Sequence, residues 1–90
     1  MSYEVRLSRE AVKTLDRMDS KTEKRIRSRL HELSDDPLDP RLSKPLTDME
    51  GLRSSRVGGW RILYTIDNSA NAVIVIAVRP RGQAYRNLHR

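Results

Sequence analysis

Alternating apolar and charged side chains open the chain. The run Tyr3-Glu4-Val5-Arg6-Leu7 repeats every two residues, which is the period of a strand with one buried face. After Ser8, an expected N-cap, apolar residues recur at helical spacing at Ala11, Leu15 and Met18. The pattern predicts a first strand followed directly by a short helix.

A second helical pattern follows at once. Ser20-Lys21-Thr22-Glu23 has the form of a capping box, in which the first and last residues each bond one free backbone N–H group. The helix is expected to end near Asp35-Asp36, because Pro37 disfavours helical geometry in the residue before it. The two helices are predicted to form an antiparallel hairpin that packs its apolar face on another layer. The apolar positions of the second helix are Ile26, Leu30 and Leu33.

The second half of the chain carries strand patterns. Residues 37–50 contain three of the four Pro and are expected to form an irregular connection, since Pro is excluded from central strands. The sequence Gly58-Gly59 predicts a two-residue hairpin loop, and Asp67-Asn68-Ser69-Ala70-Asn71 supplies the next turn. The last strand is uncharged throughout and is predicted to be the central strand of the sheet, with both faces covered. The three strands are expected at residues 52–57, 60–66 and 72–78.

The expected order of elements is β-α-α-β-β-β. It predicts one α+β domain over residues 1–90, in which an N-terminal helical hairpin packs on one face of an antiparallel sheet. Ninety residues suffice for one modest core and are too few for two domains. The chain has no Cys, so neither a disulfide framework nor a thiolate zinc site is expected. No apolar run approaches the roughly 18 residues of a membrane span, and the start lacks a signal-peptide pattern, so we expect a cytoplasmic protein without membrane contacts.

Positive charge is concentrated in the second half of the chain. Eighteen Lys and Arg against twelve acidic residues give a net charge of +6. Residues 52–90 hold seven Arg and one acid, Asp67. The excess favours an anionic partner, namely nucleic acid, an acidic protein or an anionic membrane, and the uneven placement weakens the alternative of solubility alone.

The predicted hairpin places two of these arginines next to each other. A two-residue loop at Gly58-Gly59 makes Arg56 and Arg61 direct cross-strand neighbours, with Cβ atoms about 5 Å apart. Alternate side chains of the second strand lie on the opposite face, where the helices can cover them. They are Trp60, Ile62, Tyr64 and Ile66. The two arginines are therefore expected on the uncovered face, as a phosphate-binding pair or, alternatively, as solvated side chains that splay apart or pair with acids elsewhere.

The C-terminal segment adds further candidates. The last strand runs into Arg79 and Arg81, and the pairing register decides which of them shares the face of Arg61. Tyr85, followed by Arg86, is suited to stacking on a base or to proton transfer, the alternative being ordinary packing of a C-terminal tail.

The spacing of these residues resembles a known family. The matching stretches are Lys44-Pro45-Leu46, Gly51-Leu52, the run from Arg56 to Tyr64, and the end from Ala77 through Arg81 to Tyr85-Arg86. Together they resemble the RelE/ParE toxin superfamily, and in particular its RelE-like branch. The similarity runs along essentially the whole chain, and the joint spacing is more specific than any single stretch.

The resemblance implies a ribosome-dependent endoribonuclease that cuts mRNA and is neutralised by a cognate antitoxin. It implies that Arg61 and Arg81 stabilise the reacting phosphate and that Tyr85 occupies the catalytic Tyr position. Several members of the family carry Lys on the strand before the hairpin. Here that strand has none, which leaves the general base open, with Arg53 and Lys44 as the possible substitutes. The residues expected to contact RNA are Lys44, Arg53, Arg56, Arg79 and Arg86.

The residue types favour a mechanism without metal or cofactor. The 2′-OH of RNA can attack the adjacent phosphate if the enzyme positions it, stabilises the phosphorane and assists two proton transfers. His31 lies in the second helix and His89 near the chain end, so neither is expected to be catalytic. The acids cluster at residues 35–39 and 48–50, away from the arginines and without the spacing of a metal site.

Three alternatives remain open from the sequence. A gyrase poison of the ParE type shares the fold and does not need the arginine–tyrosine cluster. A non-catalytic binding module would use the basic face only to hold an antitoxin or RNA. Separately, the basic helix strip of Lys21, Lys24, Arg25, Arg27 and Arg29 is either a solvated face with pairs such as Glu23–Arg27 or a contact for ribosomal RNA phosphates.

Overall fold

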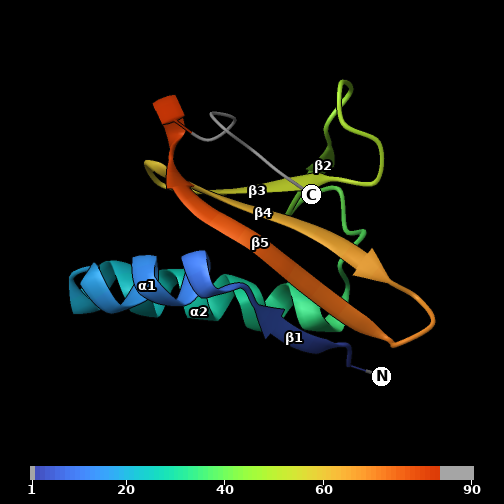
Figure 1. The fold of residues 1–90 in the computed structure, drawn as a ribbon, viewed down its shortest axis with the longest axis horizontal. Helices are drawn as coiled ribbons and strands as arrows, with labels where there is room; N and C mark the ends of the chain where they lie inside the picture. Colours follow the sequence, from blue (N-terminus) through green and yellow to red (C-terminus); the bar gives the residue numbers. More distant parts are fainter. Residues whose placement is uncertain (1, 84–90) are drawn as a thin grey trace.

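The computed structural model describes residues 2–83, and the candidates Tyr85 and Arg86 lie outside this part. Two helices lie side by side, in opposite directions, against one face of a five-stranded sheet (Figure 1). The predicted α+β class is confirmed. None of the helices in the described part is long and apolar enough to cross a membrane. The elements are β1 (Glu4–Leu7), α1 (Arg9–Arg17), α2 (Ser20–Asp35), β2 (Lys44–Pro45), β3 (Arg53–Val57), β4 (Trp60–Asp67), β5 (Ala72–Pro80) and the 3-10 turn η1 (Arg81–Gln83).

The sheet is mixed, which corrects the expectation of a purely antiparallel sheet. Its order is β1-β5-β4-β3-β2, and β1 runs parallel to β5 while all other neighbours are antiparallel. The alternation in β1 identifies which side chains share a face but holds no information about the partner strand. The long chain between β1 and β5 permits either direction, whereas the short connections elsewhere require antiparallel pairing. β5 lies between β1 and β4 and is therefore an interior strand, but the predicted central position belongs to β4.

A two-residue edge strand interrupts the connection that was expected to be irregular. In β2, Lys44 pairs with Ser54 and Pro45 with Arg53. A Pro is tolerated here because β2 is at the edge of the sheet. The pairing fixes Lys44 beside Ser54, on the face that also carries Arg56.

The helix starts are set by side-chain caps. Ser8 caps α1, as predicted, because its Oγ accepts the N–H of Ala11 at 3.0 Å. The predicted capping box at Ser20 is wrong: Asp19 caps α2, and its carboxylate accepts the N–H of Thr22 at 2.9 Å. Asp is as good an N-cap as Ser, so the helix begins one residue earlier. The backbone N–H of Thr22 is the main reason that the pKa of Asp19 is lowered.

The main core lies between the helices and the sheet. Ile62 and Tyr64 of β4 point into it, as the alternation predicted, and both are fully buried. The Tyr64 hydroxyl is hydrogen-bonded to the Pro37 carbonyl and to Ser43 Oγ, both at 2.6 Å. The buried Tyr64 hydroxyl therefore holds the Pro-rich connection against the sheet at two points, Pro37 and Ser43. The buried helix residues of this core are Ala11, Leu15, Ile26, Leu30 and Leu33.

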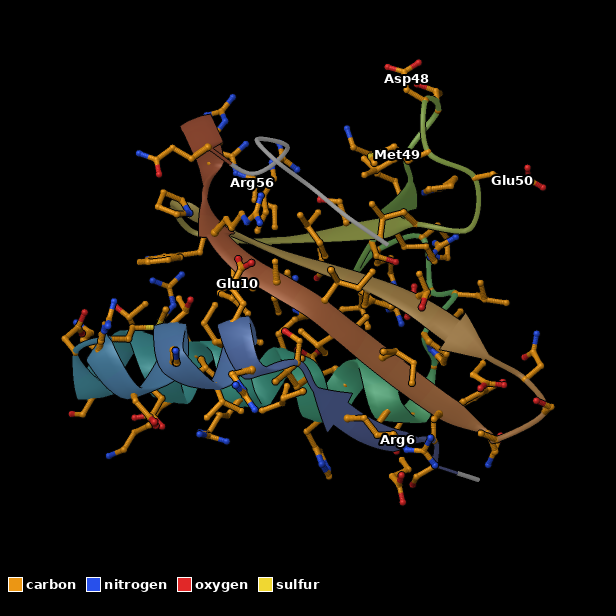
Figure 2. The ribbon with its side chains drawn as sticks, viewed as in Figure 1. Arg6, Glu10, Asp48, Met49, Glu50 and Arg56 are labelled. Atoms are coloured by element: carbon orange, nitrogen blue, oxygen red, sulfur yellow. The ribbon has the colours of Figure 1, made fainter. Side chains whose placement is uncertain are left out.

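The opposite sheet face is only partly open, which corrects the expectation of an uncovered face. Leu52, Leu63 and Ala77 form a second, fully buried cluster there. Leu46 and Met49, from the loop between β2 and β3, pack against it. Figure 2 shows the alternation in this loop, where Met49 turns inward while the neighbouring Asp48 and Glu50 point away from the sheet. The arginines are therefore confined to the part of the face near the β3–β4 turn.

The β3–β4 turn is the predicted two-residue loop. Val57 pairs with Trp60, and Gly58 has a φ of +59°. An added Cβ at Gly58 would lie 3.2 Å from Nη2 of Arg25 on α2, whereas at Gly59 it would meet no described atom within 4 Å. The turn therefore requires glycine at the first position and not at the second.

This asymmetry predicts different costs for two alanine substitutions. Gly58→Ala should lower the free energy of unfolding by about 1–2 kcal/mol, because an L residue is strained at positive φ. Gly59→Ala should change it by less than about 0.5 kcal/mol. Urea denaturation followed by circular dichroism measures both values. Equal effects of the two substitutions would contradict this description of the turn.

Candidate phosphate-binding site

Three neighbouring strands place arginines side by side on the face opposite the helices. Arg56 on β3 pairs with Arg61 on β4, and Arg61 pairs with Arg79 on β5. The first pairing was predicted from the turn; the second answers the open question of register, since Arg79 and not Arg81 is opposite Arg61. Like charges directly opposite one another destabilise a sheet. The arginine row of Arg56, Arg61 and Arg79 is therefore a feature that packing alone does not explain.

Arg79 differs from the other two because it has a carboxylate partner. Its Nε and Nη2 donate to the two carboxylate oxygens of Glu10 on α1, at 2.8 and 2.9 Å. β1 pairs with β5 only as far as Val75, so α1 can approach the remaining edge of β5. In Figure 2 the Glu10 carboxylate reaches from α1 toward β5. The hydrogen bond with Arg79 is the main reason that the pKa of Glu10 is lowered and that of Arg79 raised.

The ion pair predicts a contribution to acid sensitivity. Because the pKa of Glu10 in the folded protein lies below its ordinary 4.5, the stabilisation is present above that value and is lost as the pH falls through the folded pKa. Glu10→Gln should therefore lower the urea midpoint more at about pH 7 than at about pH 3. Equal shifts at both pH values would show that the carboxylate charge is not the cause.

Beside the arginine row, a basic hollow of about 290 Å³ opens at the edge of β3. Arg61 is held in it by its Nη1, which donates to Oγ of the buried Ser54 at 3.2 Å. Within residues 2–83, no carboxylate lies within ion-pair distance of Lys44, Arg56 or Arg61. The hollow therefore combines closely spaced cations with access to solvent. Its lining residues are Arg29, Pro40, Arg41, Leu42, Ser43, Lys44, Ser54, Arg56 and Arg61.

The structure brings some sequence candidates together and not others. Lys44, Arg56 and Arg61 share the hollow. Arg53 lies on the helix-covered face, opposite Tyr64, and its guanidinium donates to Ser43 Oγ and to the Tyr64 hydroxyl. Arg81 is exposed at the end of β5, where its N–H donates to the Gly59 carbonyl at 2.9 Å, next to the β3–β4 turn.

Two cationic residues of the lining were not expected there from the sequence. Arg29 was assigned to the solvated helix strip, yet it is half-buried and its Nη1 donates to Ser55 Oγ and to the Arg56 carbonyl, both at 2.9 Å. The available signal was its position three residues after Ile26 and four before Leu33, at the border of the apolar helix face. Arg41, within the connection, carried no periodic signal. The rest of the basic helix strip is exposed, and Arg27 pairs with Glu23 at 2.8 Å as expected.

The chemistry of the hollow is electrostatic. Guanidinium groups match the geometry of a phosphate and keep their charge at any ordinary pH. No Asp, Glu or His among the described residues lines the hollow. His31 lies on the other side of α2, in a groove with Tyr3 and Val5. Among residues 2–83, no group of three His, Asp or Glu is arranged to hold a metal ion. The arrangement suits the binding of a phosphate group and the stabilisation of charge that develops on it.

Comparison with known proteins places this chain in a family. A family model described as the ParE toxin of the type II toxin–antitoxin system parDE matches residues 5–85. The curated toxin RelE of Mycobacterium tuberculosis is 45% identical over 47 residues, which span 51% of this chain and only 48% of that relative.

Solved structures share the fold over nearly the whole chain. The toxin–antitoxin complex RelBE2 of Mycobacterium tuberculosis contains a chain that is 31% identical, with 90% of this chain and 100% of that chain covered and a TM-score of 0.77. In the intact RelBE complex of E. coli the matching chain is 20% identical, with 88% and 96% covered and a TM-score of 0.79. At that identity the likeness supports the fold alone.

Proposed function

Because this chain belongs to the RelE/ParE superfamily of toxins from type II toxin–antitoxin systems, we propose that it is an endoribonuclease that cuts mRNA on the ribosome and so inhibits translation. The observation that carries the proposal is the basic hollow of about 290 Å³, which is lined by five cationic side chains and, among residues 2–83, by no acidic one. Two of these cations, Arg29 and Arg41, pair with Glu32 and Asp39 outside the lining, whereas Lys44, Arg56 and Arg61 have no carboxylate partner in that part of the chain. A phosphate backbone is the ligand that this charge distribution favours. The protein would act in the cytoplasm, where translating ribosomes are found.

In the proposed reaction the 2′-oxygen of a nucleotide attacks the adjacent phosphorus. The bond from phosphorus to the 5′-oxygen of the next nucleotide breaks, which leaves a 2′,3′-cyclic phosphate and a 5′-hydroxyl. Arg61 and Arg81 would stabilise the charge on the phosphorane, and Arg56 and Lys44 would hold the neighbouring backbone. The hydrogen bond from Arg61 to Ser54 supports this role, because it orients the guanidinium before substrate binds.

The proton transfers are assigned to the C-terminal segment. Arginine is a poor base, because its guanidinium stays protonated at any ordinary pH. We propose Tyr85 as the proton relay and Arg86 as a further RNA contact, with no metal or cofactor. A site with weak acid–base groups depends more on substrate geometry, which the ribosome would impose on the mRNA. The exposed part of the basic helix strip is the proposed contact with ribosomal RNA phosphates.

An antitoxin is the proposed regulatory partner. The RelBE2 complex of Mycobacterium tuberculosis, whose matching chain is 31% identical, pairs a toxin with an antitoxin. A net charge of +6 favours an acidic partner that covers the cations needed for RNA.

The description of the matching family model favours one second candidate, a gyrase poison of the ParE type. Such a toxin would not require the basic hollow. A non-catalytic module that only holds antitoxin or RNA is the third outcome to be tested. The three functions differ in which nucleic acid is broken in cells.

Primer extension on an actively translated message separates these functions. The proposal predicts cuts at a fixed position within codons, which disappear when translation is blocked. Broken DNA with intact mRNA would instead identify a gyrase poison. Intact mRNA, intact DNA and normal growth on expression would leave the binding module.

A further inference from the structure

Arg29 joins three parts of the protein at the base of the basic hollow. Its Nη1 lies 2.9 Å from both Ser55 Oγ and the Arg56 carbonyl of β3, and 3.5 Å from the Leu42 carbonyl. Ser55 Oγ in turn donates to the Leu42 carbonyl at 2.7 Å. The side chain of Arg29 is only 24% exposed. We call this set of contacts the Arg29 clamp.

The clamp fixes the wall that carries Lys44. Leu42 is held by Arg29 and Ser55, and the next residue, Ser43, accepts hydrogen bonds from Arg53 at 3.1 Å. Lys44 then enters β2 opposite Ser54. The side chain of Arg29 thus links the backbone at Leu42, two residues before Lys44, to the backbone of Arg56. Lys44 and Arg56 are the two cations next to Ser54 in the lining of the hollow.

We propose that Arg29 is a positioning residue for the phosphate site, holding Lys44 and Arg56 at the spacing that the reacting RNA requires. The inference rests on the proposed function and adds to it a residue outside the RNA-contacting set. The clamp uses hydrogen bonds from one terminal nitrogen to acceptors on two chain segments, a geometry that the planar guanidinium maintains and a flexible ammonium does not. Arg29→Lys therefore preserves the charge of the hollow while loosening its wall.

The test is single-turnover cleavage of mRNA on programmed ribosomes with increasing toxin concentration. Arg29→Lys should reduce the maximal rate by about tenfold or more, because small displacements of positioning groups are costly, and should change the half-saturating concentration by less than about threefold. Arg6→Lys is the matched control, since Arg6 is exposed on β1 and does not line the hollow. A raised half-saturating concentration with an unchanged rate, or no change in either, would overturn the proposal.

A second variant guards against a general folding defect. Ser55→Ala removes one acceptor of the clamp without altering any charge, and its effect on rate should be markedly less than additive with that of Arg29→Lys. Full additivity would show that the two residues act separately. The melting temperatures of all variants identify any loss of folded protein.

Hydrogen exchange distinguishes failure of the clamp from failure of the proposed function. Amides of residues 40–45 should exchange faster in Arg29→Lys than in Arg6→Lys. If the unaltered toxin does not cut RNA, the proposed function fails, and the exchange rates still decide whether the clamp exists. Identical exchange in the two variants would refute it.

Discussion

Arg61→Ala is expected to abolish most RNA cleavage while the protein stays folded. Arg61 lies in the centre of the arginine row and lines the basic hollow. Loss of one group that stabilises developing charge typically costs about 10²–10³ in rate. Stability should change by less than about 0.5 kcal/mol, because the substitution also removes repulsion from Arg56 and Arg79. Codon-phased cleavage and thermal melting of the same preparation measure the two effects.

Two further variants control this experiment. Arg6→Ala removes the same charge from β1, and Figure 2 shows Arg6 at the opposite end of the molecule from Arg56. It should leave cleavage nearly unchanged. Arg61→Lys keeps the charge without the planar fork and should recover only part of the rate. Unimpaired cleavage by Arg61→Ala, or equal losses for Arg6→Ala, would remove the basic hollow from the mechanism.

Ile62→Ala, at the very next residue, is expected to have the reverse effect. Ile62 is fully buried in the main core, on the face opposite Arg61. Truncating a buried Ile to Ala costs about 2–5 kcal/mol, a large part of the stability of a small domain. Urea denaturation should show this loss, with Val12→Ala as a control because Val12 is 42% exposed on α1. A loss below about 1 kcal/mol for Ile62→Ala would contradict the assignment of the two faces.

The contrast between these neighbours was predictable because local signals determine it. The Gly58-Gly59 loop defines the pairing of β3 with β4 over the short range of a hairpin, and the period of two then assigns every side chain to a face. Both helices and all three C-terminal strands follow from periodicity in the same way. Lys44, Arg56 and Arg61 could be proposed as one site from this local geometry and the family resemblance.

The remaining features depend on contacts between distant segments. The parallel partner of β1, the pairing of Arg79 with Glu10 and the reach of Arg29 to β3 all join residues that no local period relates. The position of Arg53 is a different case, because it could have been predicted from the hairpin register. Arg53 and Arg56 are three residues apart in β3, so the alternation of side chains places them on opposite faces of the sheet. The packing of Met49 against the second buried cluster could not be predicted, because a single apolar residue in a loop forms no periodic pattern.

The most direct measurement of the central proposal is the chemistry of the RNA ends. Purified toxin is mixed with ribosomes programmed with mRNA, once with ordinary ribose and once with a single 2′-deoxyribose at the cleaved nucleotide. The proposal predicts a 2′,3′-cyclic phosphate and a 5′-hydroxyl from the ordinary message, and no cut in the deoxy message or in mRNA without ribosomes. Products with a 5′-phosphate and a 3′-hydroxyl, or undiminished cutting of the deoxy message, would contradict it.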